Sequence, residues 1–343
     1  AGLGIAQGRD ILGQDYEVVS VIGDGALTGG MAYEALNNAA RMKKNFIIVL
    51  NDNKMSISEN VGGMSRYLNG LRTGSGYNDL KKSVADALDR IPVVGTAMID
   101  KIKRTKNSIK QLFIPGMLFE NMGITYLGPV DGHDTNSLIR VINEAKRRKN
   151  AVMIHVLTKK GKGYAPAENH PARFHGAEPF DVATGVPLKK KMKANYTDIF
   201  STVMIKQGQR NEKIVAITAA MPDGTGTSMF QTRFPSRFID VGICEEHAVT
   251  LAAGLAARGM RPVVAIYSTF LQRAYDMLLH DVALDRLHVV LAVDRAGLVG
   301  EDGETHQGVF DVSYLNSVPG MRVYAPANFA ELKAMLEEAV LHW

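Results

Sequence analysis

The sequence has little cysteine and no long hydrophobic run. Its 343 residues include one cysteine, Cys244, which cannot form an internal disulfide and is expected to be a small core residue. Because no cysteine cluster is present to bind a metal either, the sequence indicates an intracellular, cytoplasmic protein. No apolar stretch approaches the roughly 18 to 20 residues that cross a bilayer, so a membrane protein is not expected.

Charge of one sign is not concentrated along the chain. The 40 lysine and arginine residues exceed the 35 acidic ones and give a net charge of +5. The basic residues are scattered, and the one dense run, 189–193, is short and is expected to be solvated. Nucleic acid is therefore not an expected partner. The positive excess also suits small anionic substrates, whose phosphates and carboxylates bind cationic side chains.

Two common phosphate-binding patterns are missing as well. The sequence contains no Gly-x-x-x-x-Gly-Lys-Ser/Thr motif, and no Gly-x-Gly-x-x-Gly motif opens a helix. Sites for nucleoside triphosphates and for dinucleotides are therefore disfavoured.

The first half of the chain alternates apolar strands with helical patterns. Residues 18–22 and 46–50 are expected to be strands on either side of a helix over 31–42, which makes a βαβ unit. Such units form parallel sheets, whose ligands bind beyond the carboxyl ends of the strands. Further strands are expected at 123–127 and 151–157, with a helix at 137–148.

The whole chain divides into two expected domains of the α/β class. Residues 1–170 form the first, in which the polar and basic stretch near 59–115 is expected to be a surface insertion. A linker is expected at 171–195. The second domain, 196–343, again alternates strands and helices, which predicts another parallel sheet. Its expected strands are 214–218, 238–241, 263–267, 289–293 and 322–324, and its expected helices are 245–258, 271–284 and 331–341.

The loop after the first strand has the composition of a diphosphate site. Gly25 lets the backbone approach a diphosphate closely, and the amides of Gly25 and Ala26 are expected at a helix N-terminus, where anions are stabilised. Asp24 and Asn53, which follows the next strand, offer oxygen ligands for magnesium. Gly-Asp-Gly alone is a common turn, but the asparagine on the neighbouring strand favours a magnesium diphosphate site.

This combination resembles the diphosphate fingerprint of thiamine-dependent enzymes. The resemblance implies that a second α/β domain supplies a glutamate to the pyrimidine ring of thiamine diphosphate. Glu245, at a strand end that opens a helix, stands in the matching place and would hydrogen-bond a pyrimidine nitrogen. The alternative is that Glu245 only caps the helix as a first-turn acid. We prefer the functional role for Glu245, and Glu246 is then the capping candidate.

Three longer segments resemble the 1-deoxy-D-xylulose-5-phosphate synthases, which are relatives of transketolase. They are Gly-Pro-Val-Asp-Gly-His-Asp at 128–134, the Ser-Thr-Phe-Leu-Gln-Arg-Ala-Tyr-Asp run within 265–276, and 294–308. The resemblance covers essentially the whole chain and implies two thiamine-diphosphate-binding domains of the transketolase type. It also implies a homodimer that condenses pyruvate with D-glyceraldehyde 3-phosphate, releasing carbon dioxide, as the first step of the methylerythritol phosphate route to isoprenoids.

The same resemblance assigns roles to individual residues. Catalytic roles fall to Glu245, His306, Asp302 and His175, and substrate contacts to Tyr267, Arg295 and Arg273. Cofactor contacts fall to Gly25, Ala26, Asn53, Tyr164, Glu245 and Phe270, and magnesium contacts to Asp24, Asn53 and Met55. From residue types alone, ordinary packing or surface positions are open alternatives for Phe270, Arg295, His306, His175 and Tyr164.

The chain also departs from the family pattern. It begins at Ala1 rather than at methionine and ends at Trp343 inside a helical pattern, so we expect a piece of a longer polypeptide. An upstream histidine and Gly-His-Ser segment and a downstream third domain of the family have no counterpart in it. We therefore expect this chain to bind cofactor weakly or to be inactive alone. Glu246 stands where glutamine is common in the family, a change that we expect to be tolerated.

Two other functions are open at this point. Transketolase-type ketol transfer uses the same cofactor and shares the Asp-Gly-His-Asp motif, but the long stretch at 58–115 and the run at 268–276 favour the synthase. A non-catalytic nucleic-acid-binding module would use the basic surface and is disfavoured. Salt-sensitive nucleic-acid binding that survives loss of Glu245 would identify it.

Overall fold

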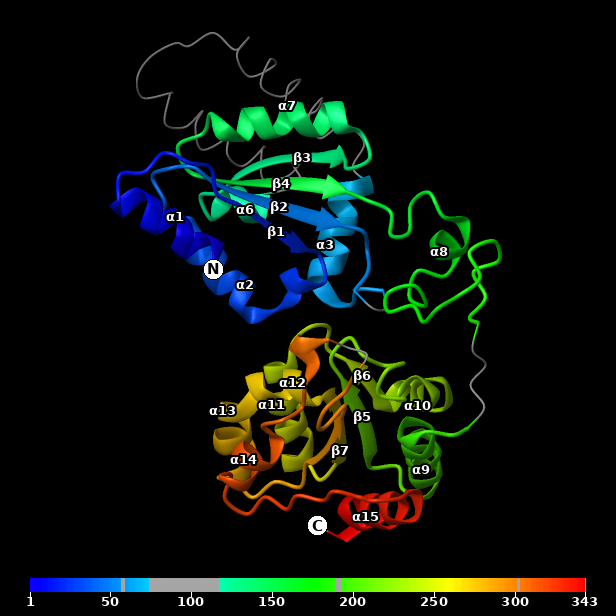
Figure 1. The fold of residues 1–343 in the computed structure, drawn as a ribbon. Coiled ribbons are helices and arrows are strands. Elements are labelled where there is room, and N and C mark those ends of the chain that lie inside the picture. Colours follow the sequence, from blue (N-terminus) through cyan, green and yellow to red (C-terminus); the bar gives the residue numbers. More distant parts are fainter. Residues whose placement is uncertain (57–58, 74–116, 189–192, 301–302, 343) are drawn as a thin grey trace, which may run out of the picture. The chain divides into compact units, whose positions relative to one another are not determined.

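The computed structural model describes residues 1–56, 59–73, 117–188, 193–300 and 303–342, which form two α/β units (Figure 1). Ala1–Ser56 and Gly62–Pro171 make up the first unit, and Ile57–Val61 with Ala172–Trp343 make up the second. Each unit has a four-stranded parallel sheet of its own. The prediction of two successive parallel-sheet α/β units is confirmed.

The sheet of the first unit has the strand order β1-β2-β4-β3. Its strands are β1 (Val19–Gly23), β2 (Phe46–Asp52), β3 (Thr125–Asp131) and β4 (Ala151–Leu157). Its helices are α1 (Gly2–Ile11), α2 (Gly30–Ala39), α3 (Gly62–Thr73), α6 (Met117–Asn121), α7 (Thr135–Lys146) and α8 (Ala165–Asn169), and a 3-10 turn, Ala26–Thr28, precedes α2. Because the strands are parallel, the loops that follow them lie at one edge of the sheet.

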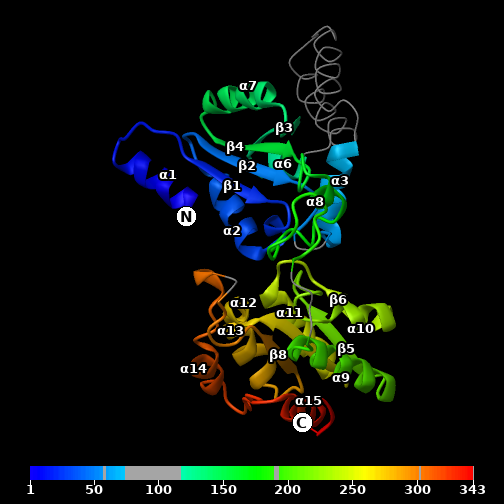
Figure 2. The same ribbon diagram turned by 45° about the vertical axis from the view of Figure 1, so that its right-hand side comes forward.

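Side chains of β2 alternate between two cores, one on each face of this sheet. Phe46, Ile48 and Leu50 belong to the core that contains α1, α2, α3 and α6, whereas Ile47 belongs to the core with Val141 of α7. This alternation is the two-residue period of a strand. Figure 2 shows α7 on one side of the sheet and α1, α2 and α3 on the other. A strand buried on both faces reads as a continuous apolar run, which is why β2 and β4 were predictable.

Helix α3 differs from the expected surface insertion. Leu68 and Leu71 are each 1% exposed and pack in the core of the first unit, with Met64 and Tyr67 beside them. Their spacing of three and four residues places them on one face of a helix. The polar and glycine residues between them masked this periodicity in the sequence. The insertion interpretation is therefore wrong for α3, and residues 74–115 lie outside the described part of the chain.

The sheet of the second unit has the order β6-β5-β7-β8. Its strands are β5 (Ile214–Thr218), β6 (Phe238–Asp240), β7 (Arg261–Tyr267) and β8 (Val290–Asp294). Its helices are α9 (Tyr196–Arg210), α10 (Ser228–Arg233), α11 (Glu245–Ala257), α12 (Ser268–Leu271), α13 (Tyr275–Met277), α14 (Asp311–Asn316) and α15 (Phe329–His342). Two cores again lie on opposite faces, one with α9, α10 and α15 and one with α11, α12 and α14.

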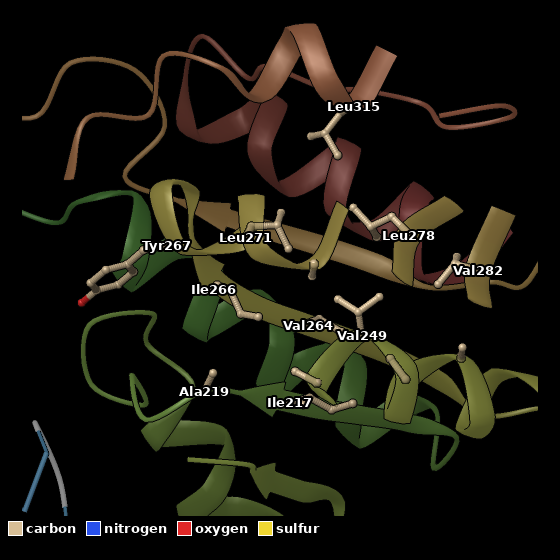
Figure 3. Packing of buried hydrophobic residues seen from close by; sticks show 14 of the residues in the cluster. Ile217, Ala219, Val249, Val264, Ile266, Tyr267, Leu271, Leu278, Val282 and Leu315 are labelled. Atoms are coloured by element: carbon tan, nitrogen blue, oxygen red, sulfur yellow. The ribbon is translucent and has the colours of Figure 1, made fainter. Parts of the chain in front are cut away.

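The core with α11 ends at a tyrosine. In Figure 3, Val249, Ile266, Leu271 and Leu278 pack together, and Tyr267 lies at one end of the cluster with its hydroxyl pointing away. Tyr267 is the last residue of β7 and is 7% exposed. The buried core therefore holds the Tyr267 ring at the point where β7 ends and the following loop region begins.

Two expectations for the second unit need correction. Residues 322–324 are not a strand, because Val323 and Tyr324 are each 38% exposed and no sheet partner lies beside them among the described residues. The helix expected at 271–284 is broken into 3-10, α and π segments, the last at Leu278–Ala283. Helix α9 of the second unit was not predicted, nor was helix α1 of the first unit. Within the described residues, no helix combines the length and the apolar character that crossing a membrane requires.

Leu68→Ala should destabilise the first unit by about 2–5 kcal/mol, because it leaves a cavity in a core that α3 helps to close. Urea unfolding followed by circular dichroism measures the change. Ile11→Ala, at a position that is 84% exposed, is the matched control and should have little effect. Equal stability of the two variants would show that α3 contributes nothing to the core.

Candidate functional site

Polar loops meet at the carboxyl edge of the sheet in the first unit. Gly23 of β1 pairs with Asn51 of β2, so the two strands end level with each other. The Asp24 amide donates to the Asn51 carbonyl at 3.1 Å. Thr158, just after β4, donates from its hydroxyl to Asn51 Oδ1 at 2.8 Å. The loops after β1, β2 and β4 are therefore joined by hydrogen bonds, as parallel geometry predicted for the first two.

Asp24 and Asn53 both hold the turn that follows β2. Asp24 is 1% exposed, and its Oδ2 accepts a hydrogen bond from the Lys54 amide at 2.8 Å. Asn53 Oδ1 accepts from the Met55 amide at 3.0 Å. Lys54 has a φ of +69°, a left-handed conformation that non-glycine residues rarely adopt. The predicted magnesium ligands Asn53 and Met55 thus lie on one turn, and Asp24, after β1, is hydrogen-bonded to that turn.

The electrostatics of this turn suit a divalent cation. Burial and the neighbouring Asp52 carboxyl raise the pKa of Asp24 to about 6. Burial acts against ionisation of Asp52 too, yet hydrogen bonds from His155 and Arg72 lower the pKa of Asp52 to about 2. At Asp24, burial and the Asp52 carboxyl outweigh the backbone hydrogen bonds from Lys54 and Asn53, which act to lower its pKa. Its oxygen, with amide and carbonyl oxygens nearby, matches the hard ligands that magnesium prefers.

The expected helix N-terminus at Gly25 and Ala26 takes a different form. Residues Ala26–Thr28 make a 3-10 turn, and α2 begins at Gly30. The Gly25 carbonyl accepts from the Thr28 amide at 3.1 Å and from the Thr28 hydroxyl at 2.7 Å. Amides in the first turn of a helix lack partners within it, so a 3-10 turn can also offer N–H groups to an anion.

The segment after β4 adds a lysine that the sequence did not reveal. Lys160 donates from Nζ to the Ser56 carbonyl at 2.7 Å, directly after Met55. Burial lowers the pKa of Lys160, while the charge of Asp24 acts in the opposite direction. A lysine in a Lys- and Gly-rich stretch belongs to no motif or period that would single it out. Tyr164 is the N-cap residue of α8, and its cofactor contact stays a prediction.

Glu245 is the buried acid of the second unit. It is the first residue of α11, is 2% exposed, and its Oε2 accepts from Arg273 Nη1 at 2.6 Å. Burial raises the pKa of Glu245 and Glu246 adds to this, although Arg273 opposes it. Arg273 Nη2 also lies 3.1 Å from Glu246 Oε1. Arg273, which the sequence assigned to substrate, therefore bridges two glutamates.

Four predicted site residues of the second unit form a row of stacked groups. The Arg295 guanidinium carbon lies 3.8 Å from the ring centre of Tyr267. The rings of Tyr267 and Phe270 stack at 5.9 Å, and His306 meets Phe270 edge-on at 5.2 Å. The sequence named all four without giving their order. Phe270 also packs against the core that contains α11, and its cofactor contact stays a prediction.

Arg295 is held firmly where it stands. Its Nη1 donates to the Gly224 carbonyl at 3.1 Å and to Asp294 Oδ1 at 2.9 Å. Its φ of +56° is left-handed, which costs about 1–3 kcal/mol and is typical of functional loops. These contacts argue against a freely solvated side chain.

The structure shows less about two of the predicted catalytic residues, Asp302 and His175. Asp302 lies outside the described residues. The backbone amide of His175 donates to the Ala172 carbonyl at 3.2 Å in the loop after α8. Their catalytic roles stay predictions. His306 Nδ1 lies 2.8 Å from the Thr305 hydroxyl, so its ring is oriented within its loop.

Comparison with known proteins identifies the family of this chain. Residues 1–158 match the family model described as 1-deoxy-D-xylulose-5-phosphate synthase, and residues 192–342 match the transketolase pyrimidine binding domain. Proteins named 1-deoxy-D-xylulose-5-phosphate synthase from Lachnoclostridium phytofermentans and Pelotomaculum thermopropionicum are 57% and 56% identical, over 98% and 100% of this chain. The chain belongs to the 1-deoxy-D-xylulose-5-phosphate synthase family. It spans about half the length of these curated relatives, 54% in both cases.

Another member of the synthase family, from Geobacter sulfurreducens, is 54% identical over 100% of this chain and 54% of its own length. Among solved structures, transketolase from Campylobacter jejuni aligns with 99% of this chain and 58% of its own at 18% identity and a TM-score of 0.41. The alignments with the synthase relatives thus span both units.

Asp24→Asn should stabilise the metal-free protein at pH 7 by roughly 1 to 3 kcal/mol, because it removes a buried negative charge. A carboxyl whose pKa is raised by folding binds its proton more tightly when folded. The contribution of the protonated Asp24 carboxyl to the free energy of unfolding is therefore lost as the pH rises from the ordinary aspartate pKa, about 4, through about 6.

Urea unfolding with EDTA at pH 4.5 and 7 measures the effect of Asp24→Asn. Asp15→Asn, at an exposed position, is the matched control and should change neither value. A variant that is less stable than the original protein at pH 7 would contradict the cost assigned to the Asp24 charge.

Proposed function

We propose that this chain carries the cofactor site of a 1-deoxy-D-xylulose-5-phosphate synthase. The reaction condenses pyruvate with D-glyceraldehyde 3-phosphate to 1-deoxy-D-xylulose 5-phosphate and carbon dioxide. One observation carries the proposal above the rest: Glu245 is a buried acid at the start of α11, within a unit that matches a pyrimidine-binding family. The identity of 52–57% to relatives named as this synthase supports the choice of reaction.

The first unit would hold the charged end of thiamine diphosphate. Asp24 and Asn53 would bind magnesium through side-chain oxygens, and Met55 through its carbonyl oxygen. The amides of Gly25 and Ala26 would donate to the diphosphate. Lys160 would add positive charge at the same edge, since its ammonium lies near the Asp24 carboxylate. Tyr164, in the segment that follows, would contact the cofactor as well.

The second unit would hold the pyrimidine end. Glu245, whose pKa is raised by burial, can keep a proton and share it with a ring nitrogen. Phe270 would stack on the pyrimidine. When bound, thiamine diphosphate supplies an electron-accepting ring that allows pyruvate to lose carbon dioxide. The protein's own task is to bind, orient and move protons at that ring.

Anion-binding and proton-transfer groups would handle the substrates. Arg295 and Arg273 offer planar guanidinium groups for a carboxylate or a phosphate, and Tyr267 positions Arg295 through its ring. His306, next to Phe270, would transfer protons at the substrate hydroxyls. His175 and Asp302 would take part in the same chemistry. We also propose a cytoplasmic homodimer, on the likeness to the family.

Transketolase-type ketol transfer is the second candidate. The match of 192–342 to a transketolase domain fits both reactions, whereas the match of 1–158 favours the synthase. The test supplies the complete gene product with pyruvate and D-glyceraldehyde 3-phosphate, or with xylulose 5-phosphate and an aldose acceptor. Carbon dioxide release with the first pair alone supports the synthase. Ketol transfer without pyruvate decarboxylation would refute it.

Glu245→Ala should reduce kcat by at least about 100-fold while thiamine diphosphate still binds, because binding rests on the diphosphate end and activation on the ring. Steady-state kinetics and cofactor titration on the complete gene product measure both. Glu246→Gln is the matched control and should retain activity within about threefold, since Glu246 touches Arg273 but is not assigned to the ring. Near-normal turnover of Glu245→Ala would remove the central acid from the proposal.

Arg295→Ala should raise KM for pyruvate or for D-glyceraldehyde 3-phosphate, or lower kcat, by about tenfold to hundredfold. Losing a charge-assisted hydrogen bond typically costs roughly 1.5 to 3 kcal/mol, which corresponds to that range. Cofactor affinity should be unchanged.

The measurement for Arg295→Ala varies each substrate in turn. Arg233→Ala, an exposed arginine at the end of α10, is the control for loss of a surface charge. An effect of Arg295→Ala below about twofold on both substrates would identify Arg295 as a surface residue.

A further inference from the structure

A row of buried polar side chains lies beneath the metal-binding turn of the first unit. It consists of Tyr126 from β3, His155 from β4, Asp52 at the end of β2 and Arg72 from α3. The first three are at most 1% exposed, and the Arg72 side chain is 9% exposed. Four elements distant in sequence thus place polar groups at one buried point. Such groups are destabilising unless they are hydrogen-bonded to one another.

The hydrogen bonds of this row converge on the Asp52 carboxylate. His155 Nε2 lies 2.8 Å from Asp52 Oδ2, so this nitrogen donates to the carboxylate. On the other side of the ring, His155 Nδ1 is hydrogen-bonded to the Tyr126 hydroxyl at 2.6 Å. Arg72 Nε donates to the same Asp52 oxygen at 2.7 Å. Three side chains therefore fix the orientation of one carboxylate.

The other oxygen of Asp52 reaches the turn itself. Asp52 Oδ1 accepts from the Lys54 amide at 3.2 Å, and the same amide donates to Asp24 Oδ2 at 2.8 Å. Lys54 is the left-handed residue of the turn, with Asn53 before it and Met55 after it. Two carboxylates thus share one N–H group where the backbone conformation is least favourable for a non-glycine residue.

We propose that Asp52 is a positioning residue, held by Arg72, His155 and Tyr126, that shapes the Asn53–Met55 turn for the divalent cation. This inference rests on the proposed magnesium and thiamine diphosphate site. We assign Asp52 no direct contact with the cation, because both of its oxygens accept hydrogen bonds and Oδ2 accepts two, from Arg72 and His155. Arg72 also balances the charge of Asp52, since its Nε lies 2.7 Å from Asp52 Oδ2.

A purely structural role is the alternative, in which the row only ties α3, β3 and β4 to β2. The two roles differ in what they predict for Asp52→Asn, which keeps the shape but removes the charge. A structural role lowers stability and leaves cation affinity alone. A positioning role weakens cation binding in protein that is still folded, and changes to residues that orient metal ligands typically weaken affinity by about 10–100-fold.

The test measures Mn²⁺ affinity by electron paramagnetic resonance in the complete gene product with thiamine diphosphate present. Asp52→Asn and Arg72→Leu should each weaken Mn²⁺ binding at least about tenfold, whereas Arg72→Lys, which keeps the charge, should stay within about threefold. Asp311→Asn is the matched control. It removes a buried carboxylate in the second unit, bonded to Ser268 at 2.6 Å, and should leave Mn²⁺ binding unchanged.

Two results would count against the proposal, and they are distinguishable. If the original protein binds Mn²⁺ and Asp52→Asn binds it within about twofold, with a lowered midpoint of thermal unfolding, the row is structural and the proposed function stands. If the original protein itself binds no Mn²⁺ with thiamine diphosphate, the proposed cofactor site fails and this inference fails with it.

Discussion

The parallel pairing of β1 with β2 is the interaction on which the candidate site of the first unit depends. Gly23 lies beside Asn51 in this pairing, so that both strands end at the same level and Asp24 reaches the turn after β2. A shift of one residue would turn alternate side chains to the other face and would separate the two loops. The two cores on either side of β2 fix the register, because Phe46 and Ile47 must face different helices.

Buried carboxyl groups divide the chemistry between the two units. Asp52 has Arg72 and His155 as donors and stays ionised, whereas Asp24 and Glu245 have raised pKa values because burial outweighs their partners. The surroundings of Asp24 favour a bound cation, whereas the surroundings of Glu245 favour a shared proton. In the proposed function, the same side-chain chemistry would serve metal binding in one unit and acid catalysis in the other.

The sequence predicted the elements whose patterns are strongest. Strands at 151–157 and 214–218 agree with β4 and β5 to the residue, since strands buried on both faces are continuous apolar runs. Asp24 and Asn53 were found because parallel strands bring their ends together. Tyr126, His155 and Arg72 could not be found this way, because single polar residues in apolar or mixed segments show no period. Their meeting point depends on tertiary packing of four elements.

The central proposal for this protein is that it binds thiamine diphosphate together with a divalent cation. The most direct measurement is a calorimetric titration of thiamine diphosphate into the complete gene product, with and without magnesium. The account predicts saturable binding of about one cofactor per chain that requires magnesium and is abolished by EDTA. Absence of binding, or binding of equal strength without any divalent cation, would contradict it.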